Sequence, residues 1–193
     1  MRIISILLVS IFTVVISFSG CKKKDETPKN QMTYNEVEYD LSHGVSENNG
    51  IWDGNEGYNF NLILLSSGFT VYEVDGKIDS LSGIGHGILF ELYSNNSDKL
   101  DDGVYTFEDG PDGKPGTFSY ADAVFNWDAQ TLEGTEVEAT TGNLSVVKAG
   151  DEYELSMNLT MKGGKTLTGF YKGILKYYIS DQKSVKKENI WSN

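Results

Sequence analysis

The sequence predicts an all-β protein, most simply an antiparallel β-sandwich, and three observations lead to this prediction. From Met32 onward, apolar residues recur at every second position, the pattern of a strand with one buried and one exposed face. Turns rich in Gly, Asn and Asp separate these runs. No run between residues 32 and 180 has the 3.6-residue apolar stripe of a helix. The long loops suit strands that change sheets, so we favour the sandwich, with a lipocalin-like β-barrel as the alternative.

The expected strands follow one another along the chain. They cover residues 33–41, 58–66, 69–78, 83–93, 103–108, 117–127, 135–140, 143–148, 151–161 and 165–179. In the region from 151 to 161, large apolar side chains alternate strictly with polar ones, and Gly163 and Gly164 then supply the backbone angles of a tight turn. The last three strands are therefore expected to form a meander. Residues 42–57 are expected to form a long loop.

The first 20 residues read as a secretory signal. Arg2 precedes an apolar run, residues 3–16, that is shorter than the roughly 20 residues of a membrane-spanning helix. The small residues before Cys21 resemble the lipobox of bacterial lipoproteins, which implies that Cys21 is lipidated and becomes the first mature residue. Residues 21–31 then form a charged tether, residues 32–180 the β-domain and residues 181–193 a charged tail. A multiply acylated Cys anchors stably to a membrane.

Three further stretches carry a resemblance to a known family. Residues 100–107 and 141–175, with residues 49–62, resemble a recurrent β-rich domain of surface lipoproteins of Bacteroidetes-type bacteria. This likeness implies an outer-membrane lipoprotein with no assigned chemistry. Residues 24–26, Lys-Asp-Glu, also resemble the signal that sends such proteins to the cell surface. The alternative interpretation is an ordinary charged spacer, with the protein on the periplasmic face.

Charge and composition exclude several classes of function. The chain has 16 basic and 28 acidic residues, and removal of residues 1–20 takes one Arg with it, leaving a net charge of −13. This balance argues against binding to nucleic acid, which needs clustered Lys and Arg. Cys21 is the only cysteine, so no disulfide or thiolate metal site is expected.

No metal or other cofactor is expected. His43 lies in the expected long loop. His86 is two positions before Ile88 in an expected strand, so both side chains point to the same face, and we interpret His86 as a core or rim histidine. The loops at 101–103 and 109–113 hold carboxylates of the kind that Ca²⁺ prefers. Asp and Gly are also the default turn residues, and we interpret both loops as turns.

The candidate binding residues are aromatic and polar side chains near strand ends. They are Trp52, Asp53, Asn55, Tyr58 and Trp127. Sugars stack on aromatic rings while amides and carboxylates bind their hydroxyls, so this set suits a glycan. The alternative role for Trp52 is to plug the end of the sandwich.

Catalytic motifs are missing from the sequence, including those of serine hydrolases and phosphate-binding loops. We therefore predict a non-enzymatic, lipid-anchored envelope protein that binds a glycan or protein ligand. Two alternatives are an assembly subunit of an envelope complex and a lipocalin-like carrier of an apolar ligand. The sequence leaves open whether two acidic residues meet in space as a catalytic pair, because that separation depends on the fold.

Overall fold

The computed structural model describes residues 28–180 except 53, 76 and 111. Within these residues the chain forms twelve strands and no helix, so no helix there could cross a membrane. The strands are β1 (Gln31–Tyr34), β2 (Val37–Asp40), β3 (His43–Gly50), β4 (Tyr58–Leu65), β5 (Phe69–Val74), β6 (Lys77–Ser94), β7 (Gly103–Phe107), β8 (Thr117–Asp128), β9 (Glu133–Ala149), β10 (Glu152–Met161), β11 (Thr166–Gly173) and β12 (Leu175–Ile179). The all-β prediction is confirmed.

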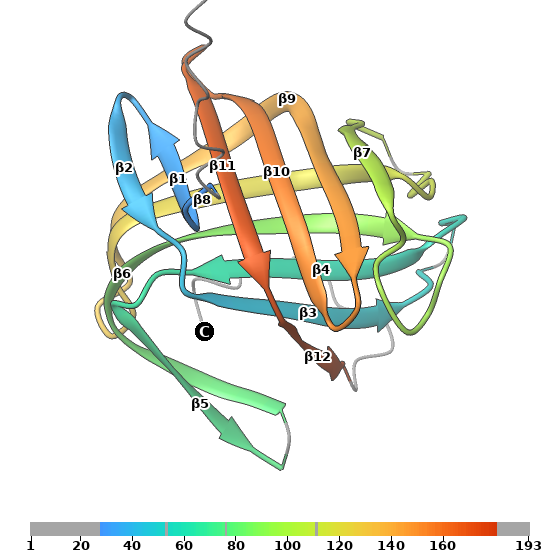
Figure 1. The fold of residues 1–193 in the computed structure, drawn as a ribbon, viewed down its shortest axis with the longest axis horizontal. Helices are drawn as coiled ribbons and strands as arrows, with labels where there is room; N and C mark the ends of the chain where they lie inside the picture. Colours follow the sequence, from blue (N-terminus) through green and yellow to red (C-terminus); the bar gives the residue numbers. More distant parts are fainter. Residues whose placement is uncertain (1–27, 53, 76, 111, 181–193) are drawn as a thin grey trace, which may run out of the picture.

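All twelve strands belong to one curled sheet (Figure 1). Its order is β12-β3-β4-β6-β8-β7-β9-β10-β11-β1-β2, with β5 added to β6 and a further pairing of β8 with β9. Two pairings are parallel, β12 with β3 and β7 with β8, and the others are antiparallel. The sheet is continuous through its hydrogen bonds, as in a barrel, and its two halves face each other, as in a sandwich.

We call these halves arm one and arm two. Arm one comprises β3, β4, β6, β8 and the first half of β9, and arm two comprises the second half of β9 with β10, β11, β1 and β2. Figure 1 shows the strands of arm two crossing in front of those of arm one. The main core fills the space between the arms, and its largest fully buried side chains include Tyr105, Phe60, Phe90, Phe118 and Met32.

A bend in β9 joins the two arms. The residues from 133 to 138 pair with β8, whereas those from 139 to 149 pair with β10. The register shifts between Thr160 and Met161, which leaves one extra residue on β9, and Gly142 follows with a φ of +140°. A Cβ atom at Gly142 would lie 2.4 Å from the carbonyl oxygen of Asn158. A bulge with a glycine is how a strand turns from one sheet direction to another.

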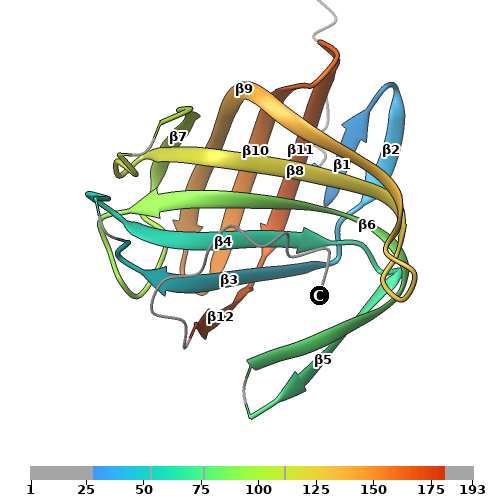
Figure 2. The same ribbon diagram turned by 180° about the vertical axis from the view of Figure 1, so that it is seen from behind.

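A second bend places a hairpin over the outer face of arm one. The first part of β6 pairs with β5, and the hairpin leaves the sheet at one end (Figure 2). Gly83, with a φ of +97°, lies where β6 turns out of the sheet, and a Cβ there would come within 2.3 Å of the oxygen of Gly68. The hairpin covers a smaller cluster whose buried members are Val45, Ile63, Leu65, Phe69, Leu89, Val124, Trp127 and Tyr178.

Several expected elements are confirmed, and others are corrected. The meander of β9, β10 and β11 forms as predicted, with Gly163 and Gly164 at positive φ in its last turn. The expected strand at 33–41 is instead the hairpin of β1 and β2, since Asn35 and Glu36 adopt positive φ. The expected strand at 165–179 divides into β11 and β12, which pair with β10 and β3 respectively. The expected loop at 42–57 begins with strand β3.

Candidate functional site

Three of the predicted binding residues lie together at one end of arm one. Trp52 and Asn55 belong to the loop between β3 and β4, and Tyr58 is the first residue of β4. The backbone of this loop bonds to the 112–113 segment, through Glu56 N to Asp112 O at 3.1 Å and Gly57 N to Gly113 O at 2.9 Å. Tyr58 packs against the main core. Asp53 lies outside the described residues.

Trp127 lies at the other end of the same arm. Tyr58 pairs with Ser94 at the end of β6, whereas Trp127 pairs with Gly85 nine positions earlier on that strand. At about 3.3 Å per residue this is roughly 30 Å. Trp127 is 8% exposed and belongs to the smaller cluster under the hairpin. The structure therefore does not bring Trp127 together with Trp52.

The histidines and the Asp-rich loops have structural partners. His43 is exposed at the start of β3, and His86 packs on the rings of Tyr39 and Phe125 while its Nδ1 accepts the backbone N–H of Asn126. Burial lowers the pKa of His86. Asp101 accepts the N–H of Asn95, Asp102 that of Lys148, and Asp112 pairs with Lys114. Within the described residues, no group of three or more His, Cys, Asp or Glu is arranged to hold a metal ion.

A groove of about 550 Å³ lies at the end of the sheet where the hairpin begins. Its walls are β3, the corner between β11 and β12, and the hairpin strand β5. Tyr171 and Tyr178 supply aromatic rings to the lining, and the polar side chains that line it are Asn30, Ser42, His43, Glu73, Glu152, Lys172 and Lys176. A concave site with a few convergent polar groups is typical of ligand binding.

Charged pairs border this groove. The Lys176 ammonium donates to both carboxylate oxygens of Glu73, which links β12 to the hairpin. The Lys172 ammonium donates to Glu154 at 2.5 Å. The hydroxyl of Tyr178 is buried beside the side chains of Glu73 and Lys176, and burial raises its pKa. Tyr178 thus offers a protonated hydroxyl, able both to donate and to accept, beside two ion pairs.

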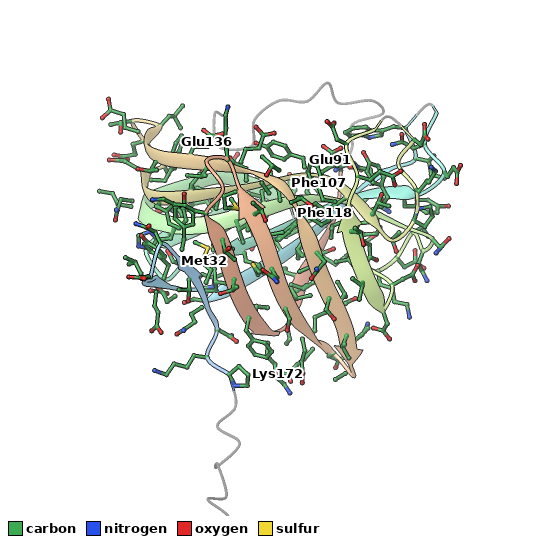
Figure 3. All side chains as sticks on the ribbon, turned by 90° about the horizontal axis from the view of Figure 1, so that it is seen from above. Met32, Glu91, Phe107, Phe118, Glu136 and Lys172 are labelled. Carbon is green, nitrogen blue, oxygen red and sulfur yellow. The ribbon has the colours of Figure 1, made fainter. Side chains whose placement is uncertain are left out.

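A second polar site lies on the outer face of arm one. The Glu91 carboxylate, only 8% exposed, accepts the hydroxyl of Tyr93 at 2.7 Å and that of Ser119 at 2.8 Å. Burial, reinforced by the Glu91 charge, raises the pKa of Tyr93 to about 12. Tyr93 therefore remains a hydrogen-bond donor at neutral pH. Figure 3 shows Glu91 and Glu136 on the side of the molecule opposite Lys172.

Asp122 lies in the middle of this outer face. It is 0% exposed, and its carboxyl group lies beside the side chains of Glu136 and Tyr120. Burial, and after it the neighbouring carboxyl group of Glu136, raises the pKa of Asp122 to about 8, and Glu138 acts in the same direction. Asp122 is therefore protonated at neutral pH. A buried carboxyl group with a strongly raised pKa is a feature of functional sites as well as of structural ones.

The sequence reasoning missed both Glu91 and Asp122. Each lies inside a correctly expected strand. An acidic residue among the apolar residues of such a strand was the signal that could have indicated a buried carboxyl group. Asp122, for example, is flanked by Ala121 and Ala123, which point into the main core. Their burial depended on which strands are neighbours, and that is not visible in the local pattern.

A comparison of the chain with models of known protein families, with curated proteins and with solved structures gave no match. The class of this protein is therefore defined by its fold. It is a curled all-β sheet with a groove at one end and two buried acidic residues, Glu91 and Asp122, on one face.

Proposed function

We propose that this protein is a non-enzymatic, lipid-anchored binding module of the bacterial cell envelope, and that a glycan binds in the groove beside the hairpin. Lipidation of Cys21 and the outer-membrane location rest on the sequence, because residues 1–27 lie outside the described residues. The module would be held outside the cytoplasm by its lipid and would present the groove to ligands.

The observation that carries the proposal is the buried hydroxyl of Tyr178 beside the Glu73–Lys176 ion pair, in a groove lined by charged and amide groups. A phenol hydroxyl beside an ammonium and a carboxylate on the wall of one groove offers a ligand both hydrogen-bond donors and acceptors. A polyhydroxylated ligand can both donate to and accept from such a phenol. The ammonium of Lys176 and the carboxylate of Glu73 would bind further hydroxyls at the same groove.

The packing of the core supports a binding module rather than a carrier of apolar molecules. A carrier encloses its ligand between the halves of its sheet. Here the space between the arms contains large buried side chains, among them Phe90 and Phe118, whose rings meet edge to face at 5.5 Å. The groove at the sheet's end is the more accessible place for a ligand.

The test is a glycan screen with the purified mature protein, followed by calorimetry on any glycan that binds. Tyr178→Phe removes only the phenol hydroxyl and is expected to weaken binding about fivefold to tenfold, the cost of roughly one lost hydrogen bond. Tyr72→Phe is the matched control, since Tyr72 is half exposed on the hairpin and does not line the groove.

Binding in the groove and binding at the loop between β3 and β4 predict different effects of the Tyr178 and Trp52 substitutions. If Trp52→Ala abolishes binding while Tyr178→Phe leaves it unchanged, the ligand binds at the loop between β3 and β4 and the groove assignment is wrong. If no member of a broad polysaccharide and glycoprotein panel binds, the proposed function itself is wrong.

A second candidate, an assembly subunit, is favoured by the sheet's edges. The path of paired strands ends at β12 and β2, and β12 exposes Ile179 at 64%, while Ile174, just before the start of β12, is exposed to the same extent. Exposed edge strands with apolar side chains readily accept a further strand. Cross-linking in intact cells would recover a defined envelope complex in this case, and Ile179→Lys would abolish its formation.

A further inference from the structure

The outer face of arm two, whose strands lie in front in Figure 1, carries an aromatic ring on β11. Leu167 and Tyr171 of this strand point into the main core. Because side chains alternate along a strand, Phe170 points outward with Thr168 and Lys172. Phe170 is half-buried, and it belongs to neither of the two hydrophobic clusters found among the described residues. Its ring is therefore free to pack against a partner.

Strand register surrounds this ring with uncharged side chains in two rows. The row of Phe170 consists of Gln31, Phe170, Ser156, Ser145 and Val104. The neighbouring row, two positions along each strand, consists of Thr33, Thr168, Asn158, Asn143 and Thr106. Each row crosses β1, β11, β10, β9 and β7, which is four strand spacings or about 19 Å. Hydroxyl and amide groups of this kind both donate and accept hydrogen bonds.

Charged groups border the two rows but do not enter them. Glu38 and Asp40 lie on the edge strand β2, opposite the ends of the rows. Glu154 lies beyond Ser156 on β10 and forms an ion pair with Lys172. The chain as a whole has a net charge of −12. An anionic polymer or a second copy of the chain would be repelled from this face, whereas an uncharged partner would not.

The face continues into the groove that contains Tyr178. Lys172 and Glu152 both line the groove. Lys172 follows Phe170 by two positions on the same side of β11, which is roughly 7 Å along the strand. A chain molecule that enters the groove can therefore extend past Lys172 and over Phe170.

We infer that the outer face of arm two is a further part of the binding site and that it binds an uncharged polysaccharide chain. One sugar ring stacks on Phe170, and its neighbours bond through their hydroxyls to Gln31, Ser156 and Asn158. The apolar C–H face of a sugar packs on an aromatic ring, while its hydroxyls need partners that both donate and accept. The inference rests on the proposed function and specifies its ligand as an extended neutral polymer.

Affinity gel electrophoresis of the mature protein measures this binding. The gels contain, one at a time, neutral polysaccharides (starch, xylan, galactomannan and mixed-linkage glucan) and anionic ones (polygalacturonate and chondroitin sulfate). We expect at least one neutral polymer to retard the protein. Phe170→Ala should raise the dissociation constant at least about tenfold, as for an aromatic residue central to an interface, and Phe170→Tyr should retain binding. Ile84→Ala, which truncates an exposed apolar side chain on β6, is the control and should have no effect.

A second variant tests the same surface without removing apolar area. Ser156 is exposed beside Phe170, so Ser156→Glu places a bulky carboxylate where the sugar would lie. This substitution should abolish retardation by the neutral polymer. Thr70→Glu is the matched control, because Thr70 is exposed on the hairpin and does not line the groove. It should leave retardation unchanged.

The results separate this inference from the proposed function. If Tyr178→Phe weakens binding while Phe170→Ala and Ser156→Glu do not, the groove alone binds the glycan and the inference is wrong. Retardation by anionic polysaccharides alone also overturns it. If sedimentation detects a dimer that Phe170→Ala dissociates, the face is an interface between two copies and the inference is again wrong. Absence of retardation in every gel contradicts both the inference and the proposed function.

Discussion

Asp122 of β8 lies directly opposite Glu138 of β9, so two carboxyl groups share one face of adjacent strands. Two ionised carboxylates in that relationship repel each other. Asp122 is fully buried and its pKa is raised to about 8, so it stays protonated at neutral pH and the repulsion is reduced. The fold therefore holds one proton that the unfolded chain would release.

This proton makes stability depend on pH in a defined direction. The folded-state pKa of Asp122, about 8, is above the usual value of 3.8. Its contribution is therefore fully present below pH ~4 and is lost as the pH rises toward ~8, at up to about 1.4 kcal/mol per pH unit. Asp122→Asn stays neutral throughout, so its free energy of unfolding should exceed that of the native protein increasingly from pH 4 to pH 8.

Urea denaturation at pH 4, 6 and 8 measures this difference. Asp79→Asn is the matched control, because Asp79 is exposed on the hairpin, and it should change stability by less than about 0.5 kcal/mol at every pH. A gain for Asp122→Asn that is the same at all three pH values would show that Asp122 is ionised in the folded state.

Glu91 should be needed for stability because it accepts the hydroxyls of buried Tyr93 and of half-buried Ser119. Glu91→Ala leaves Tyr93 and Ser119 without their acceptor and is expected to cost about 2–3 kcal/mol. Glu91→Gln keeps an acceptor oxygen and should cost less. A double-mutant cycle with Ser119→Ala should give a coupling energy of about 1 kcal/mol. Additive losses in the cycle would mean that the Ser119 bond contributes nothing.

Phe118 is expected to be the costliest of these side chains to truncate. It is fully buried between Phe90 and Phe107, each with its ring centre 5.5 Å away (Figure 3). Phe118→Ala should lower the free energy of unfolding by about 3–5 kcal/mol. Val104→Ala on β7, which is 60% exposed, should change it by less than about 0.5 kcal/mol. A loss below ~2 kcal/mol for Phe118→Ala would indicate that the core closes around the cavity.

Gly142→Ala should disturb the bend that joins the arms. The new Cβ would meet the Asn158 carbonyl at 2.4 Å, in addition to the cost of placing Ala at a φ of +140°. Gly164→Ala is the matched control, since it also has positive φ, +77°, but no heavy atom within 4 Å of its Cβ. Thermal unfolding should show the larger decrease in Tm for Gly142→Ala. Equal decreases would mean that the close contact relaxes without cost.

The local pattern of the sequence predicted most strands, because alternation of apolar and polar residues is a property of a single strand and its two faces. The strict alternation in β10 and the glycine pair at 163–164 were sufficient for the meander. It did not predict β3, whose residues are mostly polar, among them Glu47, Asn48 and Asn49. That segment is a strand because β4 and β12 pair with it on either side.

The sequence by itself determined that this protein is built of strands, where most of its turns lie and how strongly acidic it is, since these follow from residue type and short-range spacing. Only the tertiary structure decided that β9 bends from one arm to the other, that β12 leaves β11 to pair with β3, and that Trp52 and Trp127 lie at opposite ends. It also decided that Glu91 and Asp122 are buried on one face. The physical reason is that pairing and burial depend on residues far apart in the chain, and local alternation does not record which distant strand becomes the neighbour.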